Sequence, residues 1–302
     1  MKVISGSANK DLAEKVAKEL GISLSPVEIF IFPDGERRIQ IKESVLDQDV
    51  LIVQPASPPV DTNYFELFFL ADAAQRSGAR TISAVIPYLG YQRQDHIFRD
   101  GEAVSLDVVV KTLQSVGINK VIAFDLHTIK IVEEFSIPMS HLSALPIFAD
   151  YIESHNWAGL DTVLVSPDKG GIRRIKLISQ MLSDMPYAVI EKNRDVNTGH
   201  IEMAGITGEV THRALIVDDM ISSGKTIVKA AELLSQNGAE EIYVFATHAI
   251  FSDEAPQILE DSSVTKVYVS DTVLVPESKK FPKLEILSIA PHIAKEVSIG
   301  VV

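Results

Sequence analysis

Two adjacent aspartates, Asp218 and Asp219, stand between an apolar run and a turn of small residues in the stretch ALIVDDMISSGKTI (214–227). Its Gly-Lys-Thr ending resembles the phosphate loop of nucleoside triphosphatases. That motif needs a glycine where Asp219 stands, and no other Gly-Lys pair occurs in the chain, so a loop of that class is excluded. Backbone N–H groups at the start of a helix expected near Ile227 could instead hold a phosphate.

The two carboxylates must serve something other than that phosphate, because a carboxylate at close range would repel it. Ribose hydroxyls or a cation are the expected partners. A sugar phosphate satisfies both parts of the stretch, with its phosphate in the turn and its hydroxyls on the aspartates. The alternative is structural: a pair of aspartates that ends a strand, followed by a serine N-cap.

A second stretch, SPDKGGIRR (166–174), has the same design. An apolar run ends in Asp168, two glycines follow, and Lys169, Arg173 and Arg174 add positive charge. In an open α/β sheet, ligands bind at the carboxyl ends of the strands, where both stretches would lie. The alternative interpretation is a β-turn followed by a solvated helix face.

Three further stretches place polar side chains beside predicted strands. His127 in VIAFDLHT (121–128) could ligate a metal, although Mg²⁺ prefers oxygen ligands. The loop PYLGYQRQDHIFRDGE (87–102) has arginines that could bind polyphosphate and a glutamine that could contact a base. A hydrogen-bonded histidine and a salt-bridged surface loop are the alternatives. IFPDGERRIQI (31–41) predicts a hairpin with a Pro-Asp-Gly turn.

A polar segment, 191–210, contains three glycines and has no strong periodicity. This composition predicts a long loop that is either a lid or disordered. Lys192 and Arg194 at its start could reach the phosphate in a transition state, as mobile cationic loops do in phosphoryl transfer.

The elements that must position these residues alternate along almost the whole chain. Short apolar runs without strict alternation indicate strands covered on both faces, and amphipathic segments lie between them. This order predicts an α/β fold of mainly parallel sheets flanked by helices. The predicted strands occupy 49–55, 81–88, 120–127, 162–168, 187–192, 213–219 and 241–248, and the predicted helices include 67–77, 106–116, 227–236 and 290–297.

A weak internal repeat indicates two similar halves. Both contain an LIV strand, a loop, a helix, a small-residue turn and another strand, although the loop and helix are longer in the first half. We therefore expect two domains, 1–145 and 146–302, linked by a helix near 143–152. The lack of a Pro-rich linker indicates that the halves pack tightly.

Composition limits the classes of protein that need to be considered. The 302 residues are 46% hydrophobic and carry a formal charge of −13, which allows two domains and argues against nucleic-acid or membrane-surface binding. The absence of cysteine excludes disulfides, thiolate catalysis and Cys-ligated zinc. No apolar run is long enough to cross a bilayer, and no signal peptide is apparent, so we expect a cytoplasmic protein.

Five motifs, in this order and spacing, resemble those of the ribose-phosphate pyrophosphokinases, also called phosphoribosyl pyrophosphate synthetases. The last motif resembles the phosphoribosyl-binding loop of type I phosphoribosyltransferases. The five are FPDGE (32–36), PYLGYQRQD (87–95), DLH (125–127), SPDKGG (166–171) and VDDMISSGKT (217–226).

The resemblance implies two tandem phosphoribosyltransferase-like domains and a Mg²⁺-dependent transfer of the diphosphate of ATP to the 1-hydroxyl of ribose 5-phosphate. The products would be 5-phosphoribosyl 1-diphosphate, for nucleotide biosynthesis, and AMP. It also implies a homo-oligomer with the ATP site shared between subunits. Such a transfer needs mainly in-line positioning and charge neutralisation, and Mg²⁺ would supply positive charge to an acidic protein.

The resemblance also implies roles for individual residues. Lys192 and Arg194 would be the catalytic cations of the lid, and His127 and Asp168 would be metal ligands. Asp218 and Asp219 would take the ribose hydroxyls. The implied ATP contacts are Phe32, Asp34 and Glu36 of a neighbouring subunit together with Arg93, Gln94 and Asp95, and the implied 5-phosphate loop is Ser222, Ser223, Gly224, Lys225 and Thr226.

Three residues depart from the frequent family pattern, which has His at Lys169, an acidic residue at Ser222 and a small residue at Lys225. The ammonium of Lys225 could add affinity for the 5-phosphate or distort the loop. Two other hypotheses therefore stay open: a non-catalytic paralogue that serves in assembly or regulation, and a phosphoribosyltransferase that uses the same loop.

Overall fold

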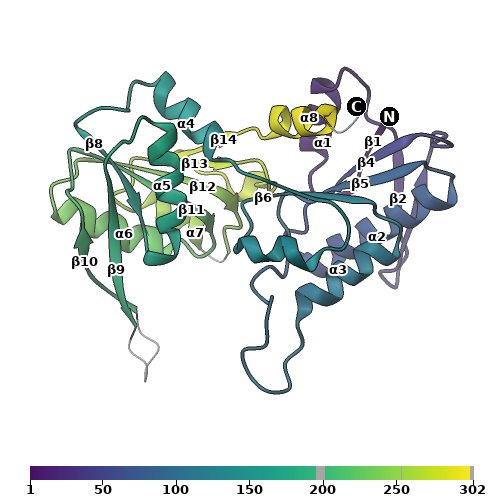
Figure 1. The fold of residues 1–302 in the computed structure, drawn as a ribbon, viewed down its shortest axis with the longest axis horizontal. Helices are drawn as coiled ribbons and strands as arrows, with labels where there is room; N and C mark the ends of the chain where they lie inside the picture. Colours follow the sequence, from purple (N-terminus) through teal and green to yellow (C-terminus); the bar gives the residue numbers. More distant parts are fainter. Residues whose placement is uncertain (195–200, 253, 300–302) are drawn as a thin grey trace. The chain divides into compact units, whose positions relative to one another are not determined.

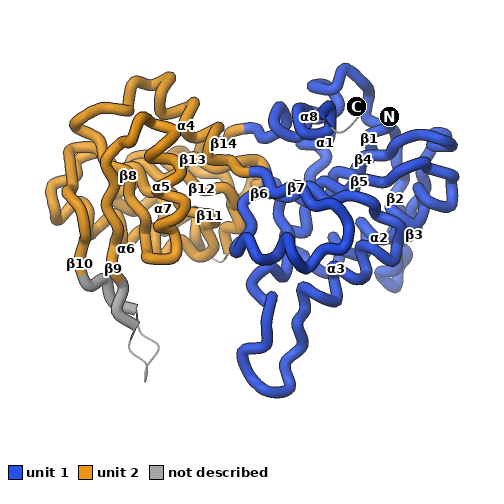
Figure 2. Tube along the Cα trace, viewed as in Figure 1, with its two compact units in different colours: residues 1–142, 272–274, 288–302 blue, residues 143–271, 275–287 orange. Residues whose placement is uncertain are grey.

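The computed structural model describes residues 1–194, 201–252 and 254–299, with side chains throughout these ranges except at 192–194 and 201–204. The chain divides into two compact units (Figure 2). The first comprises Met1–Leu142, Thr272–Leu274 and the C-terminal segment from Ser288, and the second comprises Ser143–Asp271 and Val275–Leu287.

The first unit is built on a five-stranded sheet in which all neighbouring strands are parallel, in the order β1-β4-β5-β6-β7. Helices α2 and α3 cover one face, while α1 and α8 lie together on the other (Figure 1). The strands are β1 (Lys2–Ser5), β4 (Asp49–Val53), β5 (Thr81–Val85), β6 (Lys120–Phe124) and β7 (Met139–Leu142), and the helices are α1 (Lys10–Glu19), α2 (Val60–Arg76), α3 (Ser105–Ser115), α8 (Ala290–Ile299) and the short 3₁₀ helix η1 (Ile129–Glu134).

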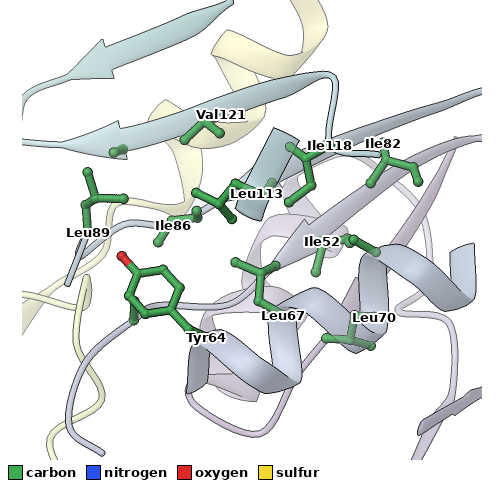
Figure 3. Close-up of a cluster of buried hydrophobic side chains, with 14 of the residues drawn as sticks. Ile52, Tyr64, Leu67, Leu70, Ile82, Ile86, Leu89, Leu113, Ile118 and Val121 are labelled. Atoms are coloured by element: carbon green, nitrogen blue, oxygen red, sulfur yellow. The ribbon is translucent and has the colours of Figure 1, made fainter. Parts of the chain in front are cut away.

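The core of this unit lies between the sheet and helices α2 and α3 (Figure 3). Ile52, Ile82 and Val121 project from the strands, and they pack with Leu67 of α2 and Leu113 of α3. All five side chains are at most 2% exposed. Burying such an aliphatic side chain stabilises the folded state by about 1.5–3 kcal/mol. The packed strands therefore hold the loops at their carboxyl ends in place.

An antiparallel hairpin, β2 (Val27–Ile31) and β3 (Arg37–Ile41), forms a separate two-stranded sheet that packs against α2. Its turn contains the predicted Pro-Asp-Gly sequence, and the backbone N–H of Glu36 donates to Asp34 Oδ1 at 3.1 Å. Gly35 has φ +92°, a left-handed conformation that glycine adopts without a steric penalty. The predicted hairpin over 31–41 is confirmed, with its first strand beginning earlier.

The second unit contains a seven-stranded sheet in the order β10-β9-β8-β11-β12-β13-β14, parallel except for the β9–β10 pair. Helices α4 and α5 pack on one face of the sheet and α6 and α7 on the other. The strands are β8 (Thr162–Ser166), β9 (Tyr187–Arg194), β10 (Ile201–Thr207), β11 (Arg213–Ile221), β12 (Glu241–Ala249), β13 (Lys266–Ser270) and β14 (Leu284–Leu287), and the helices are α4 (Leu145–Ser154), α5 (Ile172–Met181), α6 (Lys225–Gln236), α7 (Ala255–Glu260) and the short 3₁₀ helices η2 (Lys169–Gly171) and η3 (Glu277–Lys279).

The predicted α/β fold with two mainly parallel sheets is confirmed. All seven predicted strands exist, but two helices begin earlier than the sequence predicted: α2 at Val60 rather than 67, and α6 at Lys225 rather than 227. The predicted domains were 1–145 and 146–302. In the structure the second unit begins at Ser143, and the chain returns to the first unit to form α8, which contacts α1.

The prediction of an irregular loop over 191–210 was wrong for much of that segment. Strand β9 continues to Arg194 and pairs with β10, with a register shift between Met203 and Gly205. The apolar-polar alternation of the β10 sequence IEMAGIT was hidden among glycines and charges. Residues 195–200 lie outside the described part of the chain.

Among the described residues, none of the helices combines the length and the apolar character that crossing a membrane requires.

Candidate active site

The carboxyl end of β11 carries the two aspartates. Strand β11 lies between β8 and β12, and its Leu, Ile and Val side chains before the acid pair are buried. Asp218, which is paired with Ala246 of β12, is only partly buried. The backbone N–H of Asp219 donates to Asp218 Oδ1 at 2.9 Å, and that of Met220 donates to Asp219 Oδ1 at 3.1 Å. These bonds fix both carboxylates against their own backbone.

Arg174 on the first turn of α5 contacts both carboxylates. Its Nη1 donates to Asp218 Oδ1 at 3.0 Å, and its Nη2 lies 3.4 Å from Asp219 Oδ1. The three side chains are 17%, 17% and 12% exposed for Arg174, Asp218 and Asp219. Two carboxylates and one guanidinium therefore form a compact cluster that is partly open at the end of the strand.

Burial and the neighbouring charge make ionisation of this pair costly. Loss of solvent and the nearby Asp219 carboxylate raise the pKa of Asp218 to about 8, although Arg174 opposes the shift. Two adjacent carboxylates with one cation resist a second negative charge, which is the expected behaviour of a coupled acidic pair.

The predicted phosphate loop follows β11 directly and ends at the N-terminus of α6. Gly224 is the residue before the helix and has φ +74°, and a Cβ there would lie 3.4 Å from Leu259 Cγ. The first N–H groups of a helix have no acceptor within the helix, so Lys225 and Thr226 present donors to an anion. The dipole of this helix of 12 residues adds to that attraction.

Lys225 is the first residue of α6, and its side chain is exposed. The ammonium therefore does not crowd the turn, and the backbone adopts the glycine-dependent conformation with Lys225 in place. Of the two effects that the sequence left open, distortion of the loop is not observed.

The serine N-cap expected under the structural alternative is absent. Among the described residues the cap position of α6 is Gly224, which makes no side-chain capping bond. Ser222 Oγ instead lies 3.0 Å from Ser252 Oγ, and the backbone N–H of Ser252 donates to the Ser222 carbonyl at 3.1 Å. These contacts anchor the start of the loop to the segment after β12, which leaves the N-terminus of α6 uncapped.

The SPDKGG motif forms the turn between β8 and α5. Asp168 Oδ1 accepts a hydrogen bond from the Gly171 N–H at 3.2 Å, and Asp168 is half-buried. A Cβ on Gly171 would lie 2.4 Å from Ser166 Oγ, so the close turn requires glycine. The short helix η2 within this turn contacts β9 and β11, which places Asp168 at the same edge of the sheet as the acid pair.

Lys169, one of the departures from the family pattern, forms an ion pair with Glu191 of β9, with Nζ 3.4 Å from Oε1. Thr207 Oγ1 of β10 also donates to Glu191 Oε1 at 3.2 Å. Lys192 and Arg194 follow Glu191 on the same strand and pair with Met203 and Ile201. Their side chains lie outside the described part, so their predicted catalytic role stays a prediction.

In the first unit, the predicted nucleotide contacts lie on two separate loops. Phe32, Asp34 and Glu36 form the exposed turn of the β2–β3 hairpin, where the Phe32 N–H donates to the Glu36 carbonyl at 2.8 Å. The Phe32 ring meets Phe30 edge-on, with centroids 4.9 Å apart, and it is 39% exposed. This turn therefore offers an aromatic face and two carboxylates to solvent.

The second loop follows β5 and carries Arg93, Gln94 and Asp95. Arg93 and Gln94 are exposed, while Asp95 Oδ1 lies 2.6 Å from His96 Nδ1. Among the described residues no hydrogen bond or ion pair joins these three side chains to the hairpin turn. The resemblance assigned both loops to one nucleotide, with the hairpin turn coming from a neighbouring subunit. Asp61 of α2 accepts a hydrogen bond from Tyr91 of the second loop, and it lines one pocket together with Gly35 and Glu36 of the turn.

His127 is exposed just after β6, and its backbone N–H donates to Gln92 Oε1 at 2.8 Å. The preceding N–H, that of Leu126, donates to His141 Nε2 at 3.1 Å. Two side chains therefore fix the backbone of the DLH motif next to the loop of Arg93.

The two predicted metal ligands belong to different units, His127 to the first and Asp168 to the second. Within the described residues, no group of three or more His, Asp or Glu side chains could by itself hold a metal ion. Each ligand candidate does sit at the carboxyl end of a parallel strand, in a partly or fully exposed position.

Sequence reasoning missed two functional candidates. Arg174 was counted only among several positive charges, because its contact with β11 is a tertiary feature. Its position three residues after Gly171, on the first turn of a helix that follows a ligand-type loop, was the available signal. Gln92 stood beside Arg93 without being singled out, and nothing in its local sequence indicates the bond to His127.

Comparison with known proteins gives consistent results over the whole chain. Residues 1–117 match a family model described as the N-terminal domain of ribose phosphate pyrophosphokinase, and residues 191–298 match one described as a phosphoribosyl synthetase-associated domain.

Individual relatives cover nearly the full length. A ribose-phosphate pyrophosphokinase from Fusobacterium nucleatum is 40% identical over 290 residues, which span 96% of this chain and 91% of the relative. One from Gloeobacter violaceus is 39% identical over 298 residues, which span 98% and 89%. The crystal structure of phosphoribosylpyrophosphate synthetase from Mycobacterium smegmatis is 34% identical, with a TM-score of 0.90 over 99% of this chain and 98% of that chain.

Proposed function

Because the chain belongs to the ribose-phosphate pyrophosphokinase family, we propose that it transfers the diphosphate of ATP to the 1-hydroxyl of ribose 5-phosphate. The products are 5-phosphoribosyl 1-diphosphate, a precursor for nucleotide biosynthesis, and AMP. One observation carries the assignment: an acid pair and an uncapped helix N-terminus, suited to sugar hydroxyls and to a phosphate, follow each other on one strand, loop and helix.

The sugar phosphate would bind at the end of β11. Its 5-phosphate would accept hydrogen bonds from the backbone N–H groups of Ser222 to Thr226, where the α6 dipole favours negative charge. Its hydroxyls would donate to the carboxylates of Asp218 and Asp219. The sugar thereby takes one orientation, with the reacting 1-hydroxyl away from the phosphate, which lowers the entropic barrier to an in-line transfer.

The nucleotide would bind to elements of the first unit. Arg93 and Gln94 would contact its phosphates and base, with Asp95 beside them, and the exposed Phe32 ring would stack on the adenine. Asp34 and Glu36 would accept hydrogen bonds from its polar groups. Because the resemblance implies an ATP site shared between subunits, we propose that the turn serves the site of a neighbouring subunit in a homo-oligomer.

Mg²⁺ fits the donors available for such a reaction. Mg²⁺ is commonly held by one or two carboxylates together with substrate phosphates and water, so it does not require a preformed cluster of protein ligands. Asp168 offers a half-buried carboxylate, and His127 offers an exposed imidazole. Bound there with the nucleotide, Mg²⁺ would neutralise charge that develops on the transferred group.

Lys192 and Arg194 would act on the transferred diphosphate. Their strand, β9, runs past the Asp168 turn, to which Glu191 is joined through Lys169. We call the paired strands β9 and β10 the β9–β10 arm. Cations on such an arm stabilise the transition state more than the ground state if they contact the phosphate only after the arm closes over the substrates.

A direct assay tests the proposal. Purified protein incubated with Mg-ATP and ribose 5-phosphate should produce equal amounts of AMP and 5-phosphoribosyl 1-diphosphate. Both products are measured by ³¹P NMR and chromatography. A folded protein that binds ATP but forms no AMP would be a non-catalytic relative, and the proposal would fail. Release of pyrophosphate from 5-phosphoribosyl 1-diphosphate with a nucleobase, without the forward reaction, would indicate a phosphoribosyltransferase.

A further inference from the structure

We infer that Arg174 is a positioning residue of the ribose 5-phosphate site, which holds the Asp218 and Asp219 carboxylates in place and offsets their charge. This cluster of three side chains lets an acid pair bind sugar hydroxyls beside a loop that must also bind phosphate. The inference rests on the proposed function and adds to it a residue that acts through the acid pair.

The geometry suits a guanidinium. Two different nitrogens of Arg174 face two different carboxylates, at 3.0 Å to Asp218 and 3.4 Å to Asp219. A planar fork can hold both groups in fixed directions, whereas an ammonium is a single point charge on a flexible stem. The contact uses Oδ1 of each carboxylate, the same oxygens that accept the Asp219 and Met220 N–H groups.

The surroundings of Arg174 keep it in this place. It lies on the first turn of α5, directly after the SPDKGG turn, and its side chain is only 17% exposed. A Cβ on Gly171 would lie 3.4 Å from Nη1, so the glycine at this position gives the guanidinium room to cross toward β11. Arg173, its neighbour on the helix, is exposed and does not share the contact.

Charge explains why the site needs a cation here. When both are ionised, the two carboxylates bring a charge of −2, and the 5-phosphate brings nearly as much again to the adjacent loop. With Arg174 the protein part of this cluster falls to −1, so the repulsion that opposes phosphate binding falls as well. Arg174 also opposes the raised pKa of Asp218, so without it Asp218 would keep its proton to a still higher pH and lose an acceptor for the hydroxyls.

A purely structural role makes a different prediction. A salt bridge that only joins α5 to β11 would lower the stability of the protein when removed, and it would leave the affinity for ribose 5-phosphate unchanged in the folded molecules. The affinity for the sugar phosphate therefore separates the two roles.

The experiment measures binding of ribose 5-phosphate by calorimetry, without ATP, to full-length wild type and variants whose folding is checked by circular dichroism. Arg174→Met should weaken binding by at least about tenfold, because a half-buried charge pair loses its cation. Arg174→Lys, which keeps the charge without the fork, should lose less. Lys176→Met removes an exposed charge from the same helix and should bind like wild type.

A second substitution tests the charge argument. In Arg174→Met/Asp218→Asn the pair has one carboxylate and no cation, the same net charge as in the wild type with both carboxylates ionised. Asp218 is itself assigned to the sugar hydroxyls, so both single variants and the double variant are compared in a double-mutant cycle. If compensation is the role of Arg174, Asp218→Asn should weaken binding less in the Arg174→Met background than in the wild type. If Arg174→Met folds poorly, Arg174→Gln takes its place in the cycle.

The outcomes separate the inference from the proposed function. If Arg174→Met binds ribose 5-phosphate as tightly as the wild type, only the inference is overturned. An equal loss of affinity from Asp218→Asn in both backgrounds, in folded proteins, also overturns only the inference. A wild type that binds no ribose 5-phosphate at all overturns both the inference and the proposed function. Weakened binding in Arg174→Met, with a smaller effect of Asp218→Asn in that background than in the wild type, supports the inference.

Discussion

At the scale of single residues, Lys225 places an exposed charge at the proposed phosphate loop without distorting its backbone. Its ammonium stands at the N-terminus of α6, where a cation opposes the helix dipole by about 0.3–1 kcal/mol. Lys225→Ala should therefore raise the thermal midpoint slightly and raise KM for ribose 5-phosphate by about three- to tenfold, because a screened attraction is lost. Differential scanning fluorimetry and initial rates measure the two effects.

Lys229→Ala is the matched control for Lys225→Ala, since this lysine is exposed one helical turn further along α6. Its removal should leave KM unchanged. An unchanged KM in Lys225→Ala as well would mean that the ammonium does not act on the substrate.

Asp218 links stability to pH. Its pKa in the folded protein is raised from 3.8 to about 8, so between these values the folded state binds a proton that the unfolded chain has released. This contribution to stability is complete below the lower value and is lost as the pH rises through the upper one. In the wild type, the free energy of unfolding should therefore fall with rising pH between about pH 5 and pH 8, with a slope that corresponds to about one proton. Asp218→Asn should remove this contribution to the slope.

Denaturant titrations of wild type and Asp218→Asn at several pH values measure that slope. Equal slopes for the two proteins would contradict the raised pKa.

Some of the site could be predicted at this scale, and some could not. Asp218, Asp219 and the loop 222–226 are consecutive in the chain, so their types and spacing already predict a sugar-phosphate site. Arg174 lies 44 residues before Asp218. Its partners are determined by the packing of α5 against β11, which no local pattern records.

At the scale of elements, α6 carries a left-handed glycine beyond each end. Gly224 has φ +74° and close neighbours, whereas Gly238 has φ +99° and open space around it. Alanine at either position should cost about 1–2 kcal/mol, because a Cβ opposes that conformation. Only Gly224→Ala should also weaken the binding of ribose 5-phosphate, which would raise KM for this substrate.

Chemical denaturation and steady-state kinetics on both glycine variants check this prediction. Gly238→Ala is the control for backbone strain alone, and a rise of KM in both variants would assign the effect to general loss of stability. An unchanged KM in Gly224→Ala would remove the loop from the binding site.

The β9–β10 arm is the element proposed to deliver cations to the reaction. Lys192→Ala and Arg194→Ala should each lower kcat by at least about a hundredfold while ribose 5-phosphate binds nearly as before, as expected for groups that act in the transition state. Rapid-quench kinetics and binding measurements separate the two parameters. Large losses of affinity with little loss of kcat would assign both residues to ground-state binding.

The elements that sequence reasoning located best are those with continuous apolar runs, such as β4, β11 and β12. The sequence predicted β9 as a strand over 187–192 but assigned the rest of the arm, including β10, to a loop, because glycines and charges hide its apolar–polar alternation. The early start of α2 was missed for a related reason: its first turn follows two prolines and contains polar residues, which predicted a loop.

At the scale of the whole molecule, the proposed sharing of the ATP site predicts complementation between subunits. A Phe32→Ala variant damages the hairpin turn, and an Asp219→Ala variant damages the sugar-phosphate site. Mixed oligomers of the two should contain some sites with both parts intact, so activity should reappear after the inactive or weakened proteins are dissociated and mixed.

Activity of the mixture, relative to each protein alone, measures this recovery. Arg194→Ala mixed with Asp219→Ala is the control, because both residues would belong to the same half of the site and no intact site can form. Recovery in neither mixture would indicate that each chain completes its own ATP site.

The number of sheets and their mainly parallel order could be predicted because the strand and helix patterns repeat twice. The path of the chain between the units could not, since α8 has an ordinary amphipathic pattern that fits either sheet. Its place is decided by contacts with α1 and by Glu296, which accepts hydrogen bonds from Lys120 at 2.7 Å and Ser140 at 2.6 Å.

The return of α8 means that the protein cannot be divided by a single cut. Residues 1–145 expressed alone would lack α8, which contacts α1 and buries Ile293 and Val297 in the first unit. Such a fragment should aggregate. A synthetic peptide spanning 288–299, added during refolding, should keep the fragment in solution by binding in the place of α8. The second unit is thus inserted between two parts of the first, and the first unit can be completed only after the second has been synthesised.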